Sequence, residues 1–449
     1  MFRQILIAYV FFAILSFVMY LPKIVQFCYA FKKPPHKKAT GLRKIGLVIP
    51  ALDESKVIGD LFDSIEKQDY DRAYFDVNVI VKDPTDPTVA MAKALGYNVF
   101  IVPNQTCKGE ALDGCFKQIP QESFDGYAAF VIIDADAVLA SDYVTELNNA
   151  LEHDFDIFLT RKFIKNYLGD RKQRTIFSNC SALTYPMLDT LGNNYRMERG
   201  LPMNMCGQGM MVRRSVIDEL GGWPYRTLTE DYELKLDSVL HGFRSMYYPY
   251  AFIYTEEVLR HKEAYNRRLR WVTGYSQCDR IYKKQVKMKI KKRGTSGAEW
   301  FEYFFALVPL IIFIVATVLT MAGGIALALY HWLHGLPWLK DVIFLIVMPF
   351  GIMYGLEFWY SLLAMLSYRD VFKPLSGWEK LGMLLFSPLF MLEYFPIFIQ
   401  SRIRAKKGMN WQPTKHEEYE KGVAEKALEQ QAELKNAQKE DTDEKEQVS

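Results

Sequence analysis

The chain has 449 residues, of which 50% are hydrophobic and 14% aromatic, and its net charge is +3. At about 150 residues per domain, this length allows more than one domain. The near-neutral charge argues against a global basic field of the kind that binds nucleic acid, so no nucleic-acid partner is expected. Six cysteines without metal-binding spacing are typical of reduced thiols in a cytosolic compartment.

The first long apolar run predicts a membrane helix. Residues 5–31 are long enough to span a bilayer, and residues 1–31 are therefore taken as an N-terminal transmembrane helix. A signal peptide is the alternative, but no small-residue cleavage site precedes the cluster that follows. That cluster is basic, so the positive-inside rule places the next segment in the cytoplasm; its members are Lys32, Lys33, Lys37, Lys38, Arg43 and Lys44.

Residues 299–400 predict further membrane-associated helices. Two apolar spans lie at 304–333 and 342–366, after a strongly basic juxtamembrane stretch at 280–293. Glu357 lies within the second span, where a carboxylate is costly unless it faces protein or water.

The last apolar stretch, residues 378–400, is interrupted by Pro388, Glu393 and Pro396 and is followed by four basic residues. The positive-inside rule therefore favours a helix that lies in the membrane interface or re-enters, with the following chain still cytoplasmic. Residues 417–449 are rich in Glu, Lys, Gln and Ala, which predicts a frayed helix or a disordered tail.

Residues 32–298 have the alternating pattern of an α/β domain. Short apolar runs at 46–50, 77–81, 99–102 and 130–133 predict strands, and helical stretches at 57–65 and 89–95 separate the first three. The repetition predicts a parallel sheet.

Polar groups follow each predicted strand and should share one edge of this sheet. Asp53-Glu54 follows the first, Asp83 the second, Lys108-Gly109 the third, and Asp134-x-Asp136 the fourth. Each group alone is more often a helix cap or a solvated turn, but their joint occurrence favours a nucleotide site. Asp134 and Asp136 point the same way on an extended chain and could share one hard divalent cation that also binds phosphate.

Two later motifs add candidate catalytic groups. Thr229 could cap a helix that begins at Glu230, in which case Glu230 and Asp231 would only complement the helix dipole. The alternative is that Asp231 is a general base that takes the proton of a reacting hydroxyl. The second motif places Arg270 beside Trp271, and these residues suit a diphosphate and a sugar face, or else a basic helix face at the membrane.

In their order along the chain, these motifs resemble those of the membrane-bound family 2 glycosyltransferases, which include cellulose, hyaluronan and poly-N-acetylglucosamine synthases. The resemblance covers residues 45–416 and implies a GT-A-type, Rossmann-like fold for the cytosolic domain. It also implies a role for each matching residue: Asp53 at the donor, Asp83 and Lys108 at the uridine, Asp134 at the nucleotide, Asp136 at the metal, Asp231 as base, Arg270 at the diphosphate, and Glu230 and Trp271 at the acceptor.

The chain departs from the family's motifs at two positions and has the spacing of a third motif near its C-terminal end. The arginine–tryptophan motif of the family usually opens with Gln, where this chain has Arg267, and Leu52 departs from the family's opening motif. Residues 401–416 include Trp411, Thr414 and His416 in the spacing of the family's gating loop, which implies that Thr414 and His416 close over the donor. An ordinary juxtamembrane linker is the alternative.

The function implied is that of a metal-dependent, inverting hexosyltransferase using Mg²⁺ or Mn²⁺. It would move a sugar from a nucleotide-sugar donor, a UDP-sugar by resemblance, to a growing polysaccharide or glycan, forming a β-linkage. The expected location is the plasma membrane, with several spans and a cytoplasmic catalytic domain. Since three or four spans leave little wall for a polysaccharide channel, a homo-oligomer or accessory secretion subunits could complete it. Single-sugar transfer to a lipid carrier or glycolipid, and an inactive membrane scaffold, are the alternatives.

Overall fold

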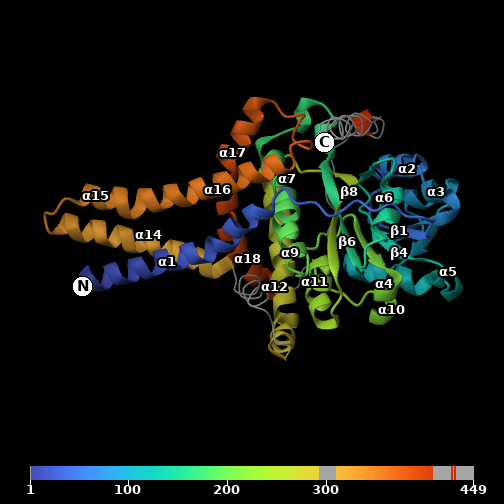
Figure 1. Cartoon of the computed structure of the whole chain (residues 1–449), viewed down its shortest axis with the longest axis horizontal. Helices are drawn as coiled ribbons and strands as arrows, with labels where there is room; N and C mark the ends of the chain where they lie inside the picture. Colours follow the sequence, from blue (N-terminus) through green and yellow to red (C-terminus); the bar gives the residue numbers. More distant parts are fainter. Residues whose placement is uncertain (1, 293–309, 408–425, 428, 431–449) are drawn as a thin grey trace, which may run out of the picture.

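A computed structural model describes residues 2–292, 310–407, 426–427 and 429–430. It has an α/β domain from which a long helical arm projects (Figure 1). The α/β domain contains one sheet of eight strands: β1 (Ile45–Pro50), β2 (Phe75–Val81), β3 (Asn98–Ile101), β4 (Ala129–Ile132), β5 (Val138–Leu139), β6 (Ile157–Ile164), β7 (Met210–Arg213) and β8 (Ser245–Thr255).

The strands lie in the order β3-β2-β1-β4-β7-β6-β8-β5. The first four are mutually parallel, as the sequence predicts, and their bounds agree with the predicted runs to within two residues. The later strands were not predicted from the sequence, and there the sheet is mixed, since β7 runs antiparallel to both β4 and β6. Composition does not indicate strand direction, because a buried strand has the same apolar residues whichever way it runs.

Helices cover both faces of the sheet. They are α2 (Ile58–Glu66), α3 (Pro87–Ala94), α4 (Lys108–Gln118), α5 (Gln121–Asp125), α6 (Tyr143–Ala150), α7 (Ile176–Ala182), α8 (Thr184–Pro186), α9 (Asn194–Glu198), α10 (Arg214–Leu220), α11 (Glu230–His241) and α12 (His261–Lys292).

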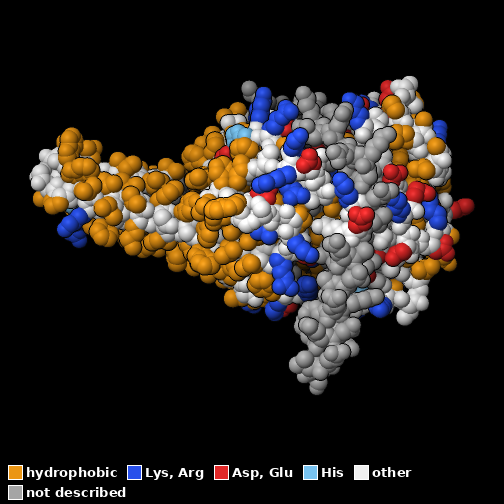
Figure 2. Space-filling model, turned by 90° about the horizontal axis from the view of Figure 1, so that it is seen from above, with side chains coloured by type: hydrophobic (Ala, Val, Ile, Leu, Met, Phe, Trp, Pro, Cys, Tyr) orange, Lys and Arg blue, Asp and Glu red, His pale blue; other side chains and the backbone are white. Residues whose placement is uncertain are grey.

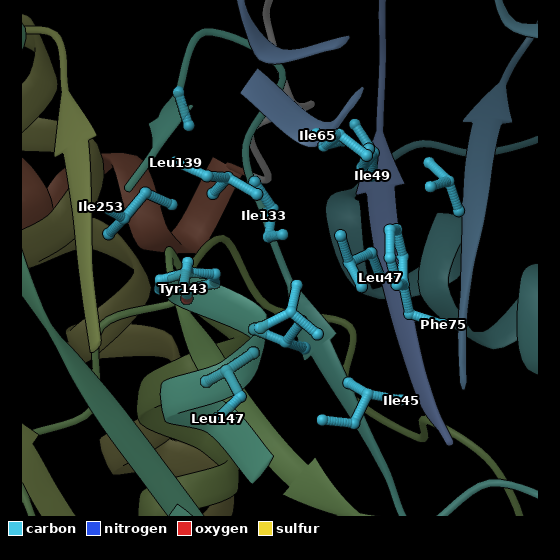
Figure 3. Packing of buried hydrophobic residues seen from close by; sticks show 14 of the residues in the cluster. Ile45, Leu47, Ile49, Ile65, Phe75, Ile133, Leu139, Tyr143, Leu147 and Ile253 are labelled. Atoms are coloured by element: carbon cyan, nitrogen blue, oxygen red, sulfur yellow. The ribbon is translucent and has the colours of Figure 1, made fainter. Parts of the chain in front are cut away.

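Side chains along β1 point alternately to the two faces of the sheet, and each face packs in its own hydrophobic cluster. Leu47 and Ile49 point to one face, where they pack in a cluster with Ile65 of α2 (Figure 3). Val48 points to the other face and packs in a second cluster with Leu112 of α4. Because such aliphatic side chains contribute about 1.5–3 kcal/mol each when buried, both faces of β1 hold it at the centre of the domain.

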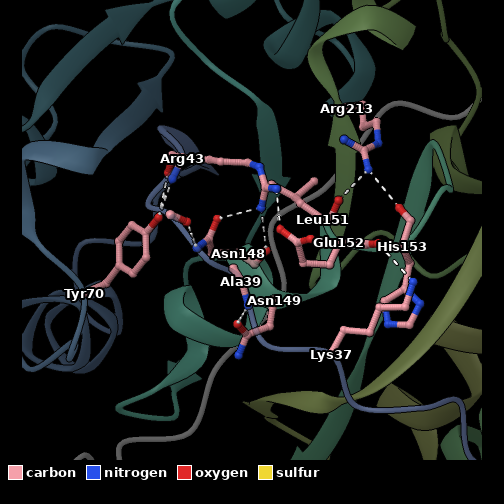
Figure 4. A network of polar contacts seen from close by, with 11 residues as sticks. Lys37, Ala39, Arg43, Tyr70, Asn148, Asn149, Leu151, Glu152, His153 and Arg213 are labelled. Carbon is pink, nitrogen blue, oxygen red and sulfur yellow. Dashed lines mark hydrogen bonds and ion pairs between the residues drawn. The ribbon is translucent and has the colours of Figure 1, made fainter.

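The basic segment that follows the apolar N-terminal helix, α1 (Phe2–Gln26), is fixed against the α/β domain. Arg43 donates to Asn148 and pairs with Glu152, and Lys37 donates to the Glu152 carbonyl (Figure 4). The backbone N–H of Ala39 donates to the side chain of Asn149. These contacts tie the chain between α1 and β1 to the C-terminal end of α6 and the turn that follows it.

The arm consists of α1 (Phe2–Gln26), α14 (Leu310–Leu333), α15 (Trp338–Val342) and α16 (Met348–Ser367), which run alongside one another (Figure 1). Figure 2 shows apolar side chains covering the arm, with Lys and Arg gathered where the arm meets the α/β domain. Glu357 of α16 is buried, and its Oε2 accepts from Lys23 Nζ at 2.7 Å and from the Tyr20 hydroxyl at 3.1 Å. As expected, this carboxylate faces protein.

The predicted interface helix is two helices, α17 (Gly377–Leu392) and α18 (Tyr394–Lys407), which cross the base of the arm instead of running along it (Figure 1). Among the described residues, four helical segments are long and apolar enough to cross a membrane: Phe2–Tyr29, Val315–Leu333, Trp338–Ser367 and Gly377–Ala405. The last includes α17 and most of α18, and its Ser401 is buried near Ser276 of α12, with the two hydroxyl oxygens 3.4 Å apart.

Candidate active site

A cavity of about 650 Å³ lies at the edge where the parallel strands end. The loop after β1 contributes Glu54, the start of α4 contributes Lys108, and the turn after β4 contributes Asp134 and Asp136. Thus three of the four predicted strand ends do meet at one site. The start of α11 and one face of α12 also line this cavity.

Lys108 is the central cation of this site. Its Nζ lies 2.6 Å from Oδ1 of Asp134 and 3.4 Å from Oε1 of Glu230. Burial opposes its charge, but Asp134, Glu230 and Asp231 outweigh that effect and raise the pKa of Lys108. Lys108 is therefore cationic at neutral pH and links the acidic pair after β4 to α11.

The carboxyl groups around Lys108 differ in their pKa shifts. Desolvation works against ionisation of Asp134, yet Lys108 and Arg270 together lower the pKa of Asp134. Glu230 is buried; its desolvation, together with the charge of Asp231, raises the pKa of Glu230 to about 7 despite Lys108. Desolvation also raises the pKa of Asp231. A raised pKa makes a carboxylate a better proton acceptor, which is what a general base needs.

Asp231 is oriented by two backbone donors. The N–H of Gly207 donates to Oδ2 and the N–H of Tyr232 donates to Oδ1, both at 2.7 Å. The predicted helix start at Glu230 is correct, but Thr229 makes no side-chain capping bond. Its side chain instead packs closely against Gly274 of α12. A Cβ added to Gly274 would lie only 2.4 Å from Thr229 Oγ1, so a larger residue would not fit there. Helix α12 therefore packs directly against the segment that carries Asp231.

Helix α12 presents Arg267, Arg270 and Trp271 to the cavity. Arg267 lies 3.4 Å from Oε2 of the fully buried Glu257, and its guanidinium lies 5.1 Å from the ring centre of Trp271. Where the family motif usually has Gln, this chain therefore has Arg267, and the carboxylate of Glu257 neutralises the charge that the arginine adds.

Two predicted donor residues lie outside the set that lines the cavity. Asp53 is exposed, with a left-handed backbone at φ 59°, and its neighbour Glu54 reaches the cavity instead. Asp83 is also exposed, and its Oδ1 accepts from the N–H of Thr85 at 2.8 Å and from its hydroxyl at 2.7 Å. These bonds lower the pKa of Asp83. Thr414 and His416, predicted to close over the donor, are outside the described residues.

The side chains in this cavity that could bind a metal ion offer carboxylate oxygens. Asp134 and Asp136 both line the cavity, and Asp134 is engaged by Lys108. Within the described part of the chain, no group of three or more acidic, His or Cys side chains is arranged to hold a metal ion. Two carboxylates are the kind of oxygen ligand that a hard divalent cation prefers, and a cation bound by these two alone would need further ligands from outside the protein.

Several lining residues were not singled out from the sequence. Glu256 lies just after β8 and Glu257 follows it, so the rule that located the other strand ends would have found this pair. Gly207 could not be recognised in this way, because its role depends on α11 lying beside it. The same holds for Tyr20 and Lys23 of α1, which line the cavity from the arm.

The comparison with known proteins agrees with this geometry. The sequence model described as glycosyl transferase family group 2 matches residues 129–369, which is more than half of the chain. The chain belongs to this family. This glycosyltransferase is 25% identical over 257 residues to the β-monoglucosyldiacylglycerol synthase of Nostoc sp., which covers 54% of the chain and 52% of that protein. It is 24% identical over 257 residues to the synthase of the same name from Trichormus variabilis, with the same coverage.

The glycosyltransferase thus spans about half the length of the curated relatives that it matches. Among solved structures, it is similar to the mannosyltransferase PcManGT from Pyrobaculum calidifontis, solved with GDP-Man and Mn²⁺. The TM-score is 0.50 at 16% identity, over 80% of this chain and 98% of that one. The predicted GT-A-type fold of the α/β domain is confirmed by this likeness.

Proposed function

We propose that this glycosyltransferase transfers a hexose from a nucleotide-sugar donor, a UDP-sugar, to a hydroxyl acceptor at the membrane and inverts the anomeric centre. The observation that carries the proposal is Asp231, whose two oxygens are held by backbone N–H groups at the wall of a cavity that also contains Asp134 and Arg270. An oriented carboxylate and a diphosphate-binding arginine in one cavity are what a single displacement at a sugar carbon requires.

In this reaction the acceptor oxygen forms a bond to the anomeric carbon as the bond from that carbon to the diphosphate oxygen breaks. Asp231 receives the acceptor proton, and the nucleoside diphosphate leaves with the electron pair of the broken bond. A single displacement converts an α-linked donor into a β-glycoside. Arg270 offers planar donors to the diphosphate, and Trp271 offers a flat face to the acceptor.

A divalent cation, Mg²⁺ or Mn²⁺, would be held by Asp136 with the diphosphate and would neutralise charge on the leaving group. Lys108 positions Asp134 and carries a permanent positive charge at the same end of the site. In this proposal Arg270 and the cation orient the donor, and the backbone N–H groups of Gly207 and Tyr232 hold Asp231 in position as the base.

The proposal includes a location and a topology. The helical arm would cross the plasma membrane, while α17 and α18 would lie in its cytoplasmic interface and the α/β domain in the cytoplasm. The orientation of α17 and α18 across the base of the arm supports this arrangement (Figure 1). So does the burial of Ser401 near Ser276 of the catalytic domain.

Incubation of the purified protein with a panel of radiolabelled nucleotide sugars tests the proposal. Release of a nucleoside diphosphate together with a β-linked product is expected for at least one donor. A protein that binds a donor and transfers nothing to any acceptor would instead be an inactive scaffold. Product length separates a polysaccharide synthase from an enzyme that adds one sugar.

A further inference from the structure

The cavity extends beyond the catalytic carboxylates to the membrane helices. Its lining includes four consecutive or near-consecutive residues of α1 and two of α18: Met19, Tyr20, Pro22, Lys23, Tyr394 and Phe398. The surface of α1 just beyond them is apolar, since Ile14, Phe17 and Val18 are exposed. The same cavity therefore has both Asp231 and residues of α1 in its lining, and the α1 residues adjoin an exposed surface suited to lipid.

Lys23 is the one charged side chain that the described parts of α1 and α18 contribute to this lining. Its charge is neutralised, because Nζ lies 2.7 Å from Oε2 of Glu357. The ammonium group is further surrounded by the rings of Tyr20 and Tyr360, whose centres lie 5.1 and 4.8 Å away. The membrane end of the cavity thus presents a compensated ion pair and aromatic rings.

The charges of the whole lining favour an uncharged acceptor. Among the described residues, six carboxylates line the cavity, namely Glu54, Asp134, Asp136, Glu230, Asp231 and Glu256, against four cations, namely Lys23, Lys108, Arg267 and Arg270. Three of these cations pair with carboxylates, and in the proposed function the fourth, Arg270, and the divalent cation at Asp136 both serve the donor diphosphate. A lipid phosphate acceptor would bring a further anion next to these carboxylates and would have to compete with the donor for the same cations.

We propose that the acceptor is an uncharged membrane lipid with a free hydroxyl group, of the diacylglycerol class, which reaches Asp231 from the bilayer between α1 and α18. This inference rests on the proposed function and names its acceptor. The lipid hydroxyl forms the bond to the anomeric carbon, its proton goes to Asp231, and the nucleoside diphosphate leaves. The acyl chains remain against the apolar surface of α1.

The full-length protein in phospholipid nanodiscs provides the test. Each labelled nucleotide sugar is offered with 1,2-dioleoylglycerol, with a polyprenyl phosphate or with a soluble oligosaccharide, and both products are measured. Label on dioleoylglycerol is expected. Transfer only to the polyprenyl phosphate or to the oligosaccharide overturns the acceptor inference and leaves the proposed function intact. If no nucleoside diphosphate is released with any pair, the proposed function itself fails.

Two tryptophan substitutions test the route. Met19→Trp fills the cavity from α1, whereas Ile352→Trp places the same ring on the exposed surface of α16, outside the cavity lining and on a helix other than α1 and α18. Met19→Trp should raise the apparent KM for dioleoylglycerol about tenfold or more, equivalent to about 1.4 kcal/mol, with little change in the KM for the donor. Ile352→Trp should change neither. Equal effects of the two substitutions on the KM for the lipid would overturn the proposed route.

Discussion

The backbone N–H of Gly207 donates to Oδ2 of Asp231 at 2.7 Å, which brings the main chain against the most crowded charged part of the cavity. A Cβ at position 207 would lie only 3.0 Å from Oε1 of Glu230 and 3.3 Å from Nζ of Lys108. A glycine here therefore allows one backbone donor to orient the base while the neighbouring carboxylate and ammonium keep their contact.

Asp231→Asn should reduce transfer by about 10² to 10⁴ while donor affinity stays nearly constant, because the amide cannot accept the acceptor proton. Transfer rates and donor binding by calorimetry would measure the two effects separately. Asp237→Asn is the matched control, since Asp237 is buried on the same helix, bonds Tyr225 and does not line the cavity. If Asp231→Asn retains full activity, the carboxylate only supports the start of α11.

In the donor-free protein, Glu230 should take up a proton as the pH falls through about 7. The Asp231 carboxylate contributes to that raised pKa, so Asp231→Asn should move the titration of Glu230 to lower pH. Lys108 acts in the opposite direction, so Lys108→Met should move it to higher pH. Infrared difference spectra measure the carboxyl band, which Glu230→Gln identifies by its loss. Shifts of the same sign in both variants would contradict the coupling.

Excess EDTA should abolish transfer, and added Mg²⁺ or Mn²⁺ should restore it. Asp136→Ala should weaken donor binding about tenfold or more, equivalent to about 1.4 kcal/mol, and should also slow turnover, since the cation links this carboxylate to the diphosphate. Titration of the donor with and without metal measures the linkage. Undiminished activity in EDTA would remove Asp136 from the metal role.

Arg268→Met should lower the free energy of unfolding by about 2 kcal/mol, because it removes the buried hydrogen bond to the Phe390 carbonyl. It also leaves Glu393 with His261 as its charge partner. Arg268 is buried in α12, pairs with Glu393 between α17 and α18, and has its guanidinium carbon 3.7 Å from the ring centre of Phe390. Arg260→Met is the control, since Arg260 is mostly exposed and should change stability by about 0.5 kcal/mol or less. Thermal unfolding in detergent compares the two, and equal values of Tm would contradict this role of Arg268.

The topology can be tested with cysteines at two exposed positions, Leu336 between α14 and α15 and Ile403 on α18. In sealed cells, with Cys28 replaced, Leu336→Cys should react with an impermeant maleimide from outside. Ile403→Cys should react only after the cells are opened, because α18 is expected to lie on the cytoplasmic side. Reaction of Ile403→Cys from outside would show that residues 377–405 cross the membrane.

Much of the candidate site could be predicted from the sequence because local rules determine it. The β1 to β4 runs are apolar and short, and polar groups follow them, so Asp134, Asp136 and Lys108 were placed at one edge before the fold was known. The start of α11 at Glu230 was also correctly predicted. Asp53 and Asp83 follow β1 and β2 in the same way, but the structure places both side chains on the exposed surface, because the turn after each strand decides where a side chain points.

The apolar spans, the strand ends and the order of the motifs were thus determined by the sequence itself, since each depends on residues close together in the chain. Only the tertiary structure decided which way β7 runs, that Lys108 joins Asp134 to Glu230, and that α17 and α18 cross the base of the arm. It also brought Lys23 to Glu357, 334 residues away, and placed Lys23 in the lining of the cavity. The physical reason is that charge pairing and cavity shape arise between distant segments, for which local composition and periodicity carry no signal.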